Sequence, residues 1–243
     1  MVNQRPRRFW KQAAVIDDCA LLGTSGFGIA LDGRPVRVPS RKPLVVQTRA
    51  LAEAVAEEWN SQGETLDPDT MPMTQLATTA QDRVGMMRDA IIDELMAFAG
   101  SEVLCYRAAE PADLVARQAA VWDPLLAWAT GRFGCAWAVT EGLMPVTQPP
   151  AVHVALRAAF EAMDDATLTA VQVAAPLCGS PLIGIALVEG RMTAEDAYTT
   201  SLVDELYQAA QWGDEYEAVQ RRNRIRAELE SVARYLGLVR LPA

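Results

Sequence analysis

The spacing of apolar residues changes near residue 48, and this change constrains the fold more than any other feature. Before it, Phe27, Ile29 and Leu31 alternate with small residues, a pattern typical of a strand with one buried face. After it, apolar residues recur every three or four positions, as on one face of a helix. We therefore predict an α+β protein, in which a small β-rich N-terminal domain with one helix precedes a larger all-helical C-terminal domain.

Local signals place the predicted elements. Asp32-Gly33 suits the tight turn of a hairpin, and Pro35 puts the returning strand near an edge of its sheet. A helix is predicted from Thr48 to Gly63, followed by an extended link and a long helix that Thr74 caps. The domains are predicted at 1–70 and 71–243. Further helices are predicted at 114–122, 124–133, 152–163, 167–174, 181–188, 194–210 and 217–236. Ser180 is predicted to cap the helix at 181–188, and Thr193 with Asp196 to form a capping box at the start of the helix at 194–210.

Composition narrows the functional classes. The 243 residues are 51% hydrophobic and carry a net charge of -9, with a sequence pI near 4.7. Binding to nucleic acid or to anionic membranes requires concentrated positive charge, so neither partner is expected. No apolar stretch is long enough to span a bilayer, and no signal peptide is recognisable. We expect a protein of the bacterial cytoplasm, equivalent to the mitochondrial matrix in organellar relatives, and a monomer when free.

Candidate catalytic and metal-binding residues are few. The four cysteines lie far apart and His153 is the only histidine, so the usual zinc patterns are missing. The glycine-rich segment 23–28 is predicted to be a turn, because a strand follows it and no Gly-Lys-Ser or Gly-Lys-Thr does. The acidic pairs at 17–18, 57–58 and 164–165 are predicted to lie on solvated faces. We predict no catalytic residue, no metal and no cofactor.

A polar and aromatic stripe is predicted on the helix at 194–210 and just beyond it. Glu205, Gln208 and Trp212 lie within about 60° of one another on an ideal helix. An exposed carboxylate and amide beside an indole have the composition of a protein-interface hot spot. The competing interpretation is an amphipathic helix whose tryptophan packs in the core.

Other tryptophans leave the same two alternatives open. Asp123 is predicted to cap a helix whose first residue is Pro124, which gives Trp122 and Trp128 a structural explanation. Whether Trp59, Trp122 and Trp128 belong to the core or to an interface is not decided by their spacing.

Several segments, in this order along most of the chain, resemble the assembly chaperones of the F-type ATP synthase that bind the alpha subunit. The matching residues are Arg8-Phe9-Trp10-Lys11, Leu31-Asp32-Gly33-Arg34-Pro35, Glu58-Trp59-Asn60-Ser61-Gln62, Met71-Pro72-Met73-Thr74-Gln75-Leu76-Ala77, Trp122-Asp123-Pro124-Leu125-Leu126-Ala127-Trp128, and Glu205-Leu206-Tyr207-Gln208 with Trp212-Gly213.

The resemblance implies a two-part molecule without enzymatic activity or cofactor. It implies binding to unassembled alpha subunit, whose beta-facing surface stays masked until beta takes its place. The partner-binding residues carried over are Glu205, Gln208, Trp212 and Gly213, with neighbouring Asp204. Two departures occur: no histidine follows the Trp-Gly pair, and Gly179 instead of lysine precedes Ser180.

Two other functions are kept as alternatives. The first is a metal-independent hydrolase or transferase that uses Cys105 or paired carboxylates in a cleft between the two domains; converging carboxylates with a raised pKa would favour it. The second is a permanent subunit of another complex, which would be retained in the finished assembly.

Overall fold

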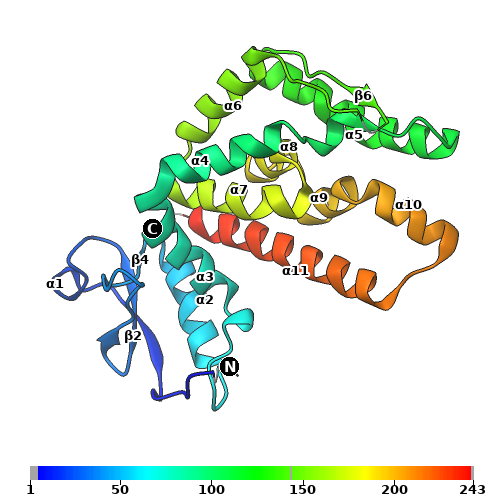
Figure 1. Cartoon of the computed structure of the whole chain (residues 1–243). Helices are drawn as coiled ribbons and strands as arrows, with labels where there is room; N and C mark the ends of the chain where they lie inside the picture. Colours follow the sequence, from blue (N-terminus) through cyan, green and yellow to red (C-terminus); the bar gives the residue numbers. More distant parts are fainter. Residues whose placement is uncertain (1–4, 143, 242–243) are drawn as a thin grey trace. The chain divides into compact units, whose positions relative to one another are not determined.

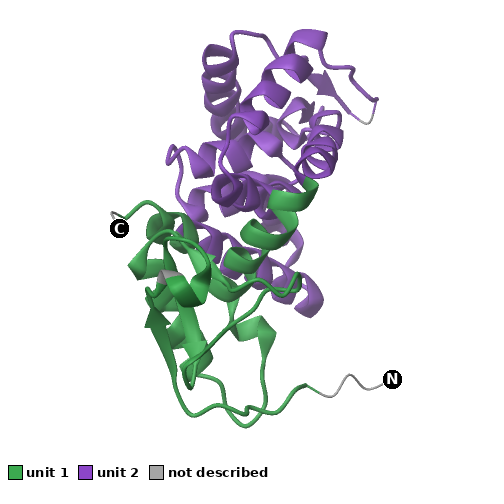
Figure 2. Cartoon of the chain, turned by 90° about the vertical axis from the view of Figure 1, so that its left-hand side faces the viewer, with its two compact units in different colours: residues 1–87, 234–243 green, residues 88–233 purple. Residues whose placement is uncertain are grey.

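The computed structural model describes residues 5–142 and 144–241, and its chain forms two compact units (Figure 2). Unit 1 comprises Met1–Met87 with Arg234–Ala243, and unit 2 comprises Arg88–Ala233. The last part of the chain therefore belongs to the same unit as the first part. The predicted domain boundary near residue 70 lies within unit 1 and stays a prediction, because compactness does not show that a segment folds alone.

The sheet of unit 1 is antiparallel and is organised around β2 (Phe27–Leu31), as Figure 1 shows. β2 pairs with β1 (Ala13–Ile16), β3 (Arg34–Pro35) and β4 (Val45–Val46). The predicted hairpin is confirmed: both residues of the turn have positive φ, 48° at Asp32 and 82° at Gly33.

Residues 19–28 connect β1 to β2. Helix α1 (Cys19–Leu22) is followed by Gly23 and Gly26, both with positive φ, so the glycine-rich segment is a turn as predicted. Gly28 is required for another reason: a Cβ atom there would lie 2.4 Å from the Leu22 side chain and 3.2 Å from the Leu44 carbonyl oxygen.

Helix α2 (Arg49–Asn60) packs against this sheet. Thr48 caps it, accepting a hydrogen bond from the Leu51 N–H at 3.2 Å and donating one to the Leu238 carbonyl at 2.8 Å. The second bond ties α2 to the late segment of unit 1.

A buried carboxylate of α2 caps the next helix. Glu58 accepts hydrogen bonds from the backbone N–H of Met73 (2.7 Å), the N–H of Thr74 (2.8 Å) and the Thr74 hydroxyl (2.7 Å). These groups lie in the first turn of α3 (Pro72–Thr78). The predictions that Glu58 lies on a solvated face and that Thr74 caps this helix are both wrong, because free N–H groups at a helix start need an acceptor and Glu58 supplies it.

The long helix predicted up to Gly100 is interrupted. After α3 the chain forms a π-helix, η2 (Thr79–Val84), and then α4 (Gly85–Ala99), within which Met87 has non-helical angles (φ -124°, ψ 27°). A π-turn changes the register of side chains around the axis, which the regular apolar spacing does not reveal.

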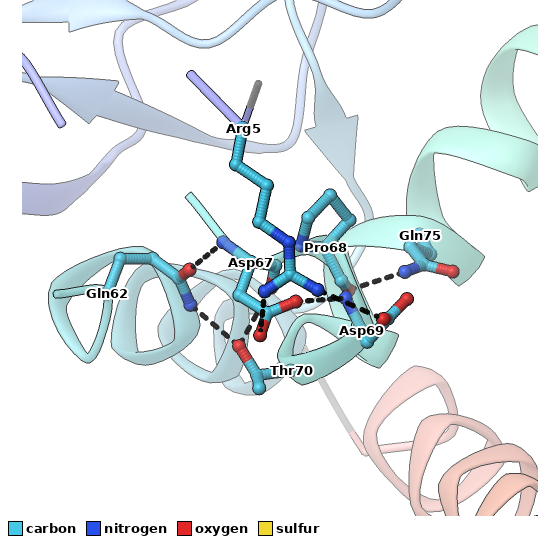
Figure 3. A network of polar contacts seen from close by, with 7 residues as sticks. All are labelled: Arg5, Gln62, Asp67, Pro68, Asp69, Thr70 and Gln75. Carbon is cyan, nitrogen blue, oxygen red and sulfur yellow. Dashed lines mark hydrogen bonds and ion pairs between the residues drawn. The ribbon is translucent and has the colours of Figure 1, made fainter. Parts of the chain in front are cut away.

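A polar network joins the N-terminal segment to the link between α2 and α3, where η1 (Pro68–Thr70) lies (Figure 3). Arg5 forms ion pairs with Asp67 and Asp69. The buried Gln62 donates to the Thr70 hydroxyl at 3.0 Å and accepts from the Asp67 N–H at 2.7 Å. The link is thus held by Arg5 from the N-terminal segment and by Gln62, which follows α2.

Unit 2 is built around α8 (Pro181–Val188), a helix in which all eight residues are buried. It packs against α7 (Asp165–Cys178), where Gly184 approaches Val171 and Ala175. Ser180 caps α8 by accepting from the Ile183 N–H at 2.9 Å, as predicted from the sequence. The other helices from residue 112 on are α5 (Ala112–Phe133), α6 (Pro150–Glu161), α9 (Ala194–Ser201), α10 (Val203–Trp212) and α11 (Tyr216–Val239).

Helix α5 continues through Pro124, so the predicted cap at Asp123 is wrong. Tertiary contacts hold the helix across the proline. Trp122 is buried and its indole N–H donates to the Thr200 carbonyl at 2.8 Å, while Asp123 lies 2.8 Å from Arg107 in an ion pair. Besides its helices, unit 2 contains η3 (Val103–Cys105) and a two-residue parallel pair of strands, β5 (Tyr106–Arg107) and β6 (Thr140–Glu141).

Candidate functional site

The residues predicted to bind a partner lie on the helical hairpin that α10 forms with α11 (Figure 1), on the part that belongs to unit 2. The single helix predicted at 194–210 breaks at Leu202, whose φ and ψ are -109° and 22°, and this break separates α9 from α10. Helix α10 ends at Gly213, where φ is 87° and ψ is 174°, a conformation that is accessible to glycine.

The carboxylate of Glu205 holds the hairpin together. It forms ion pairs with Arg221 and with Arg222, the latter at 3.3 Å, and Arg222 also pairs with Asp214 in the turn. The Arg222 side chain is buried, and its hydrogen bond to Asp214 is the main cause that raises the pKa of its guanidinium above the ordinary value. Two arginines therefore compensate the charge of Glu205 inside the hairpin, and Glu205 is not the free carboxylate that the predicted stripe suggested.

The opposite side of α10 is tied to α5. Asp204 accepts a hydrogen bond from the buried Gln118 side chain at 2.6 Å. The hydroxyl of Tyr207 donates to Asp113 at 2.8 Å, and this bond raises the pKa of the Tyr207 phenol. Asp204 thus positions the helix that carries the candidate site.

The outer end of the hairpin exposes two aromatic side chains, Trp212 and Tyr216, each 78% accessible. They lie at either end of the turn at 213–215, and Gln208 is exposed on α10. Trp212 therefore does not pack in the core, and exposed large aromatic side chains are typical of interface anchors. Tyr216 was missed, because it is the first residue of α11 and belongs to no apolar repeat.

The other aromatic and methionine segments are largely internal. Trp122 belongs to the core, and Trp59 and Trp128 are half-buried against Trp10 and Phe133 respectively. In the Met71-Pro72-Met73 segment both methionines are buried.

A nucleophilic role for Cys105 has no support in the site geometry. Its thiol is buried, and this burial is the main cause that raises its pKa to about 12, which leaves almost no reactive thiolate near neutral pH. Within residues 5–142 and 144–241, no group of three or more His, Cys, Asp or Glu side chains could hold a metal ion. Across the same residues, no helix has both the length and the apolar character needed to cross a bilayer.

Comparison with known proteins identifies the family. The model of the ATP12 chaperone protein family matches residues 7–130. A solved structure of Atp12 from Paracoccus denitrificans is 36% identical, with a TM-score of 0.88 over 97% of this chain and 99% of that one. This chain belongs to the ATP12 chaperone family.

Other relatives agree with this assignment. The structure of an aspartate-to-lysine mutant of P. denitrificans Atp12p matches with the same identity and TM-score, covering 97% of this chain and 98% of that one. The mitochondrial protein atp12 of Schizosaccharomyces pombe is 24% identical over 85% of this chain and 74% of its own length. The resemblance to ATP synthase assembly chaperones is thereby confirmed. As a member of the ATP12 family, the chain is a chaperone in ATP synthase assembly, not an enzyme.

Proposed function

We propose that this ATP12-family chaperone binds the unassembled alpha subunit of the F-type ATP synthase and shields its beta-facing interface until the beta subunit replaces it. The proposed contact surface is the outer end of the α10–α11 hairpin, with Gln208, Trp212 and Gly213 at its centre. Tyr216 extends it. The observation that carries this proposal is the exposure of Trp212. Burial of its indole against a partner would be favourable, because apolar surface is removed from water.

The internal contacts of the hairpin support the proposal. Asp204 and Glu205 belong to the partner-binding region as positioning residues, because their contacts hold α10, which carries Trp212, to α5 and α11. An anchor that is already ordered loses little conformational entropy when it binds.

Charge around the turn fits a basic partner surface. Residues 214–217 contain three carboxylates and no cation, and complementary charge speeds encounter and selects partners. A contact limited to one hairpin end is small, so a subunit that buries more surface can displace it. We propose a monomer that acts in the bacterial cytoplasm.

A pull-down with separately expressed alpha and beta subunits tests the proposal. We expect capture of alpha alone, weakened by salt and lost on addition of beta. Replacing Trp212 by alanine should weaken capture of alpha about 30-fold, the effect of removing a hot-spot anchor. The control is Val154→Ala, which removes another exposed apolar side chain of unit 2.

Three results would contradict the proposal. They are equal capture by the Trp212 and Val154 variants, capture of beta in place of alpha, and retention of the chaperone in the finished enzyme. The last would make the protein a permanent subunit.

A further inference from the structure

An unpaired backbone edge lies at the N-terminal segment of unit 1. Residues 6–8 pair antiparallel with residues 64–66: the Arg8 N–H donates to the Glu64 carbonyl at 2.9 Å, and the Leu66 N–H donates to the Pro6 carbonyl at 2.8 Å. With these bonds on either side of the Arg7–Thr65 bridge, the N–H and C=O of Arg7 point away from Thr65. Within the described part of the chain, no hydrogen bond satisfies them.

The side chains of this segment divide between two faces. Arg8 and Trp10 point inward, where the Arg8 guanidinium lies 5.4 Å from the centre of the Trp10 ring. Arg7 and Phe9 are exposed. Phe9 is 81% accessible, and its ring lies edge-to-face with the Trp10 ring, with 5.1 Å between the ring centres. The edge therefore presents a cation and a phenyl ring on its outer face.

Polar contacts hold the edge in place before any partner arrives. The Arg8 guanidinium donates to the carbonyls of Trp10 (3.0 Å), Lys11 (2.9 Å), Asn60 (3.2 Å) and Gln62 (2.5 Å). Arg5 anchors the start of the segment through its ion pairs with Asp67 and Asp69 (Figure 3). An extended segment fixed in this way loses little entropy when it pairs with a strand of another chain.

The segment at residues 6–10 also contributes to an open pocket of about 690 Å³, which is lined by Arg7, Arg8, Trp10, Gln62, Gly63 and Glu64. Its lining holds two arginines and one carboxylate, a positive balance in a chain whose net charge is -9. The Arg8 hydrogen bonds reach neutral carbonyl oxygens, so they do not neutralise its charge. The charge of the pocket is complementary to a carboxylate.

We propose that the edge at residues 6–9 binds an extended acidic segment of a partner protein by strand addition. The incoming backbone pairs with the free N–H and C=O of Arg7, a carboxylate of the segment faces the Arg7 guanidinium, and an apolar side chain covers Phe9. Exposed strand edges bind extended peptides in this way. The edge shares no residue with the contact surface on the α10–α11 hairpin, and this proposal goes beyond the function proposed above, since it does not depend on which subunit the chaperone holds.

Binding of a synthetic peptide to the full chain tests this proposal. The probe is a capped, fluorescein-labelled peptide Asp-Thr-Val-Thr-Asp-Thr, in which aspartate and valine lie two residues apart and therefore share one face, as Arg7 and Phe9 do. Two comparison peptides carry lysine in place of aspartate, or N-methyl groups on the aspartates and the valine, which block the backbone N–H groups that would face the edge. We expect the acidic peptide to bind at least about tenfold more tightly than either, and to shift the amide NMR signals of Arg7 and Phe9.

Matched variants separate the edge from the rest of the surface. Arg7→Glu should weaken binding about fivefold, since a surface ion pair is modest and becomes repulsive here. Phe9→Ser should weaken binding about tenfold through lost apolar burial. Arg34→Glu and Leu21→Ser alter an exposed cation and an exposed apolar side chain elsewhere in unit 1, and they should leave binding unchanged.

Each opposing outcome overturns the proposal. Amide shifts away from residues 6–9, equal binding of the lysine or N-methylated peptide, or equal losses in the control variants would show that no acidic strand adds here. Shifts of the Arg7 and Phe9 amides that grow with protein concentration in the absence of peptide would assign the edge to a second copy of this chain. All of these readings use the chaperone alone, so they are independent of whether alpha subunit is captured.

Discussion

Removal of the Glu58 carboxylate should destabilise unit 1 far more than removal of its neighbour Glu57. Glu58 is buried and accepts three hydrogen bonds from Met73 and Thr74 at the start of α3. Alanine at this position leaves the buried N–H of Met73 and the partly buried N–H and hydroxyl of Thr74 without their acceptor. Hydrogen bonds to charged groups contribute about 1.5–3 kcal/mol each and are not additive, so we expect Glu58→Ala to lower the free energy of unfolding by about 3–5 kcal/mol.

Two further variants bracket this value. Glu58→Gln keeps the shape but offers one acceptor oxygen, and its amide group faces N–H donors; we expect a loss of about 2 kcal/mol. Glu57 is exposed and lies 3.9 Å from Arg234 in a surface ion pair. Glu57→Ala should change stability by no more than about 0.5 kcal/mol.

Urea unfolding measured by hydrogen exchange at the Met73 and Thr74 amides reports on this site directly. Site-specific exchange is needed because two compact units can unfold in separate steps. Equal protection of these amides in the Glu58→Ala and Glu57→Ala variants would refute the reasoning, because Glu58 would then contribute nothing to the start of α3.

Two other predictions concern unit 2. Glu102 is fully buried, and burial raises its pKa from 4.5 to about 7. The folded state therefore keeps the Glu102 proton to a higher pH than the unfolded state does. As a result, the free energy of unfolding should fall by about 3 kcal/mol as the pH rises from about 4.5 to 7. The difference between Glu102→Gln and the native chain in pH-dependent thermal unfolding measures this slope, and an identical slope in both would contradict it. Arg222→Met should destabilise the α10–α11 hairpin by about 2 kcal/mol, since Asp214 loses its partner and Glu205 keeps Arg221 alone. Arg224→Met on the same helix is the control for urea unfolding, and equal midpoints would show that the ion pairs do not hold the hairpin.

Features with local causes could be predicted from the sequence. The turn at Asp32-Gly33, the cap at Ser180 and the capping box between Thr193 and Asp196 each lie within a few residues, and all three are present. The same holds for α8, whose bounds match the predicted range 181–188. In each case the residue types that favour the conformation are adjacent in the chain.

Features with distant partners could not be predicted. Glu58 caps a helix that begins 14 residues later, and Glu102 accepts a hydrogen bond from Leu182, 80 residues away. Glu205 has the helical position expected of an exposed carboxylate, but its arginine partners come from the next helix. The spacing of residues along a helix or strand shows which face of that element a side chain is on. It does not show which other element packs against that face.

The membership of residues 234–243 in unit 1 imposes an order on biosynthesis. Thr48 bonds to the Leu238 carbonyl, and Arg234 pairs with Glu57. Residues 5–87 emerge from the ribosome long before residues 234–243 are synthesised. Unit 1 is therefore the first unit to be translated and the last to be completed. The surface of unit 1 that packs against residues 234–243 therefore stays exposed while the helices of unit 2 are synthesised. Exposed packing surface is prone to aggregation, so the newly made chaperone passes through an aggregation-prone stage itself.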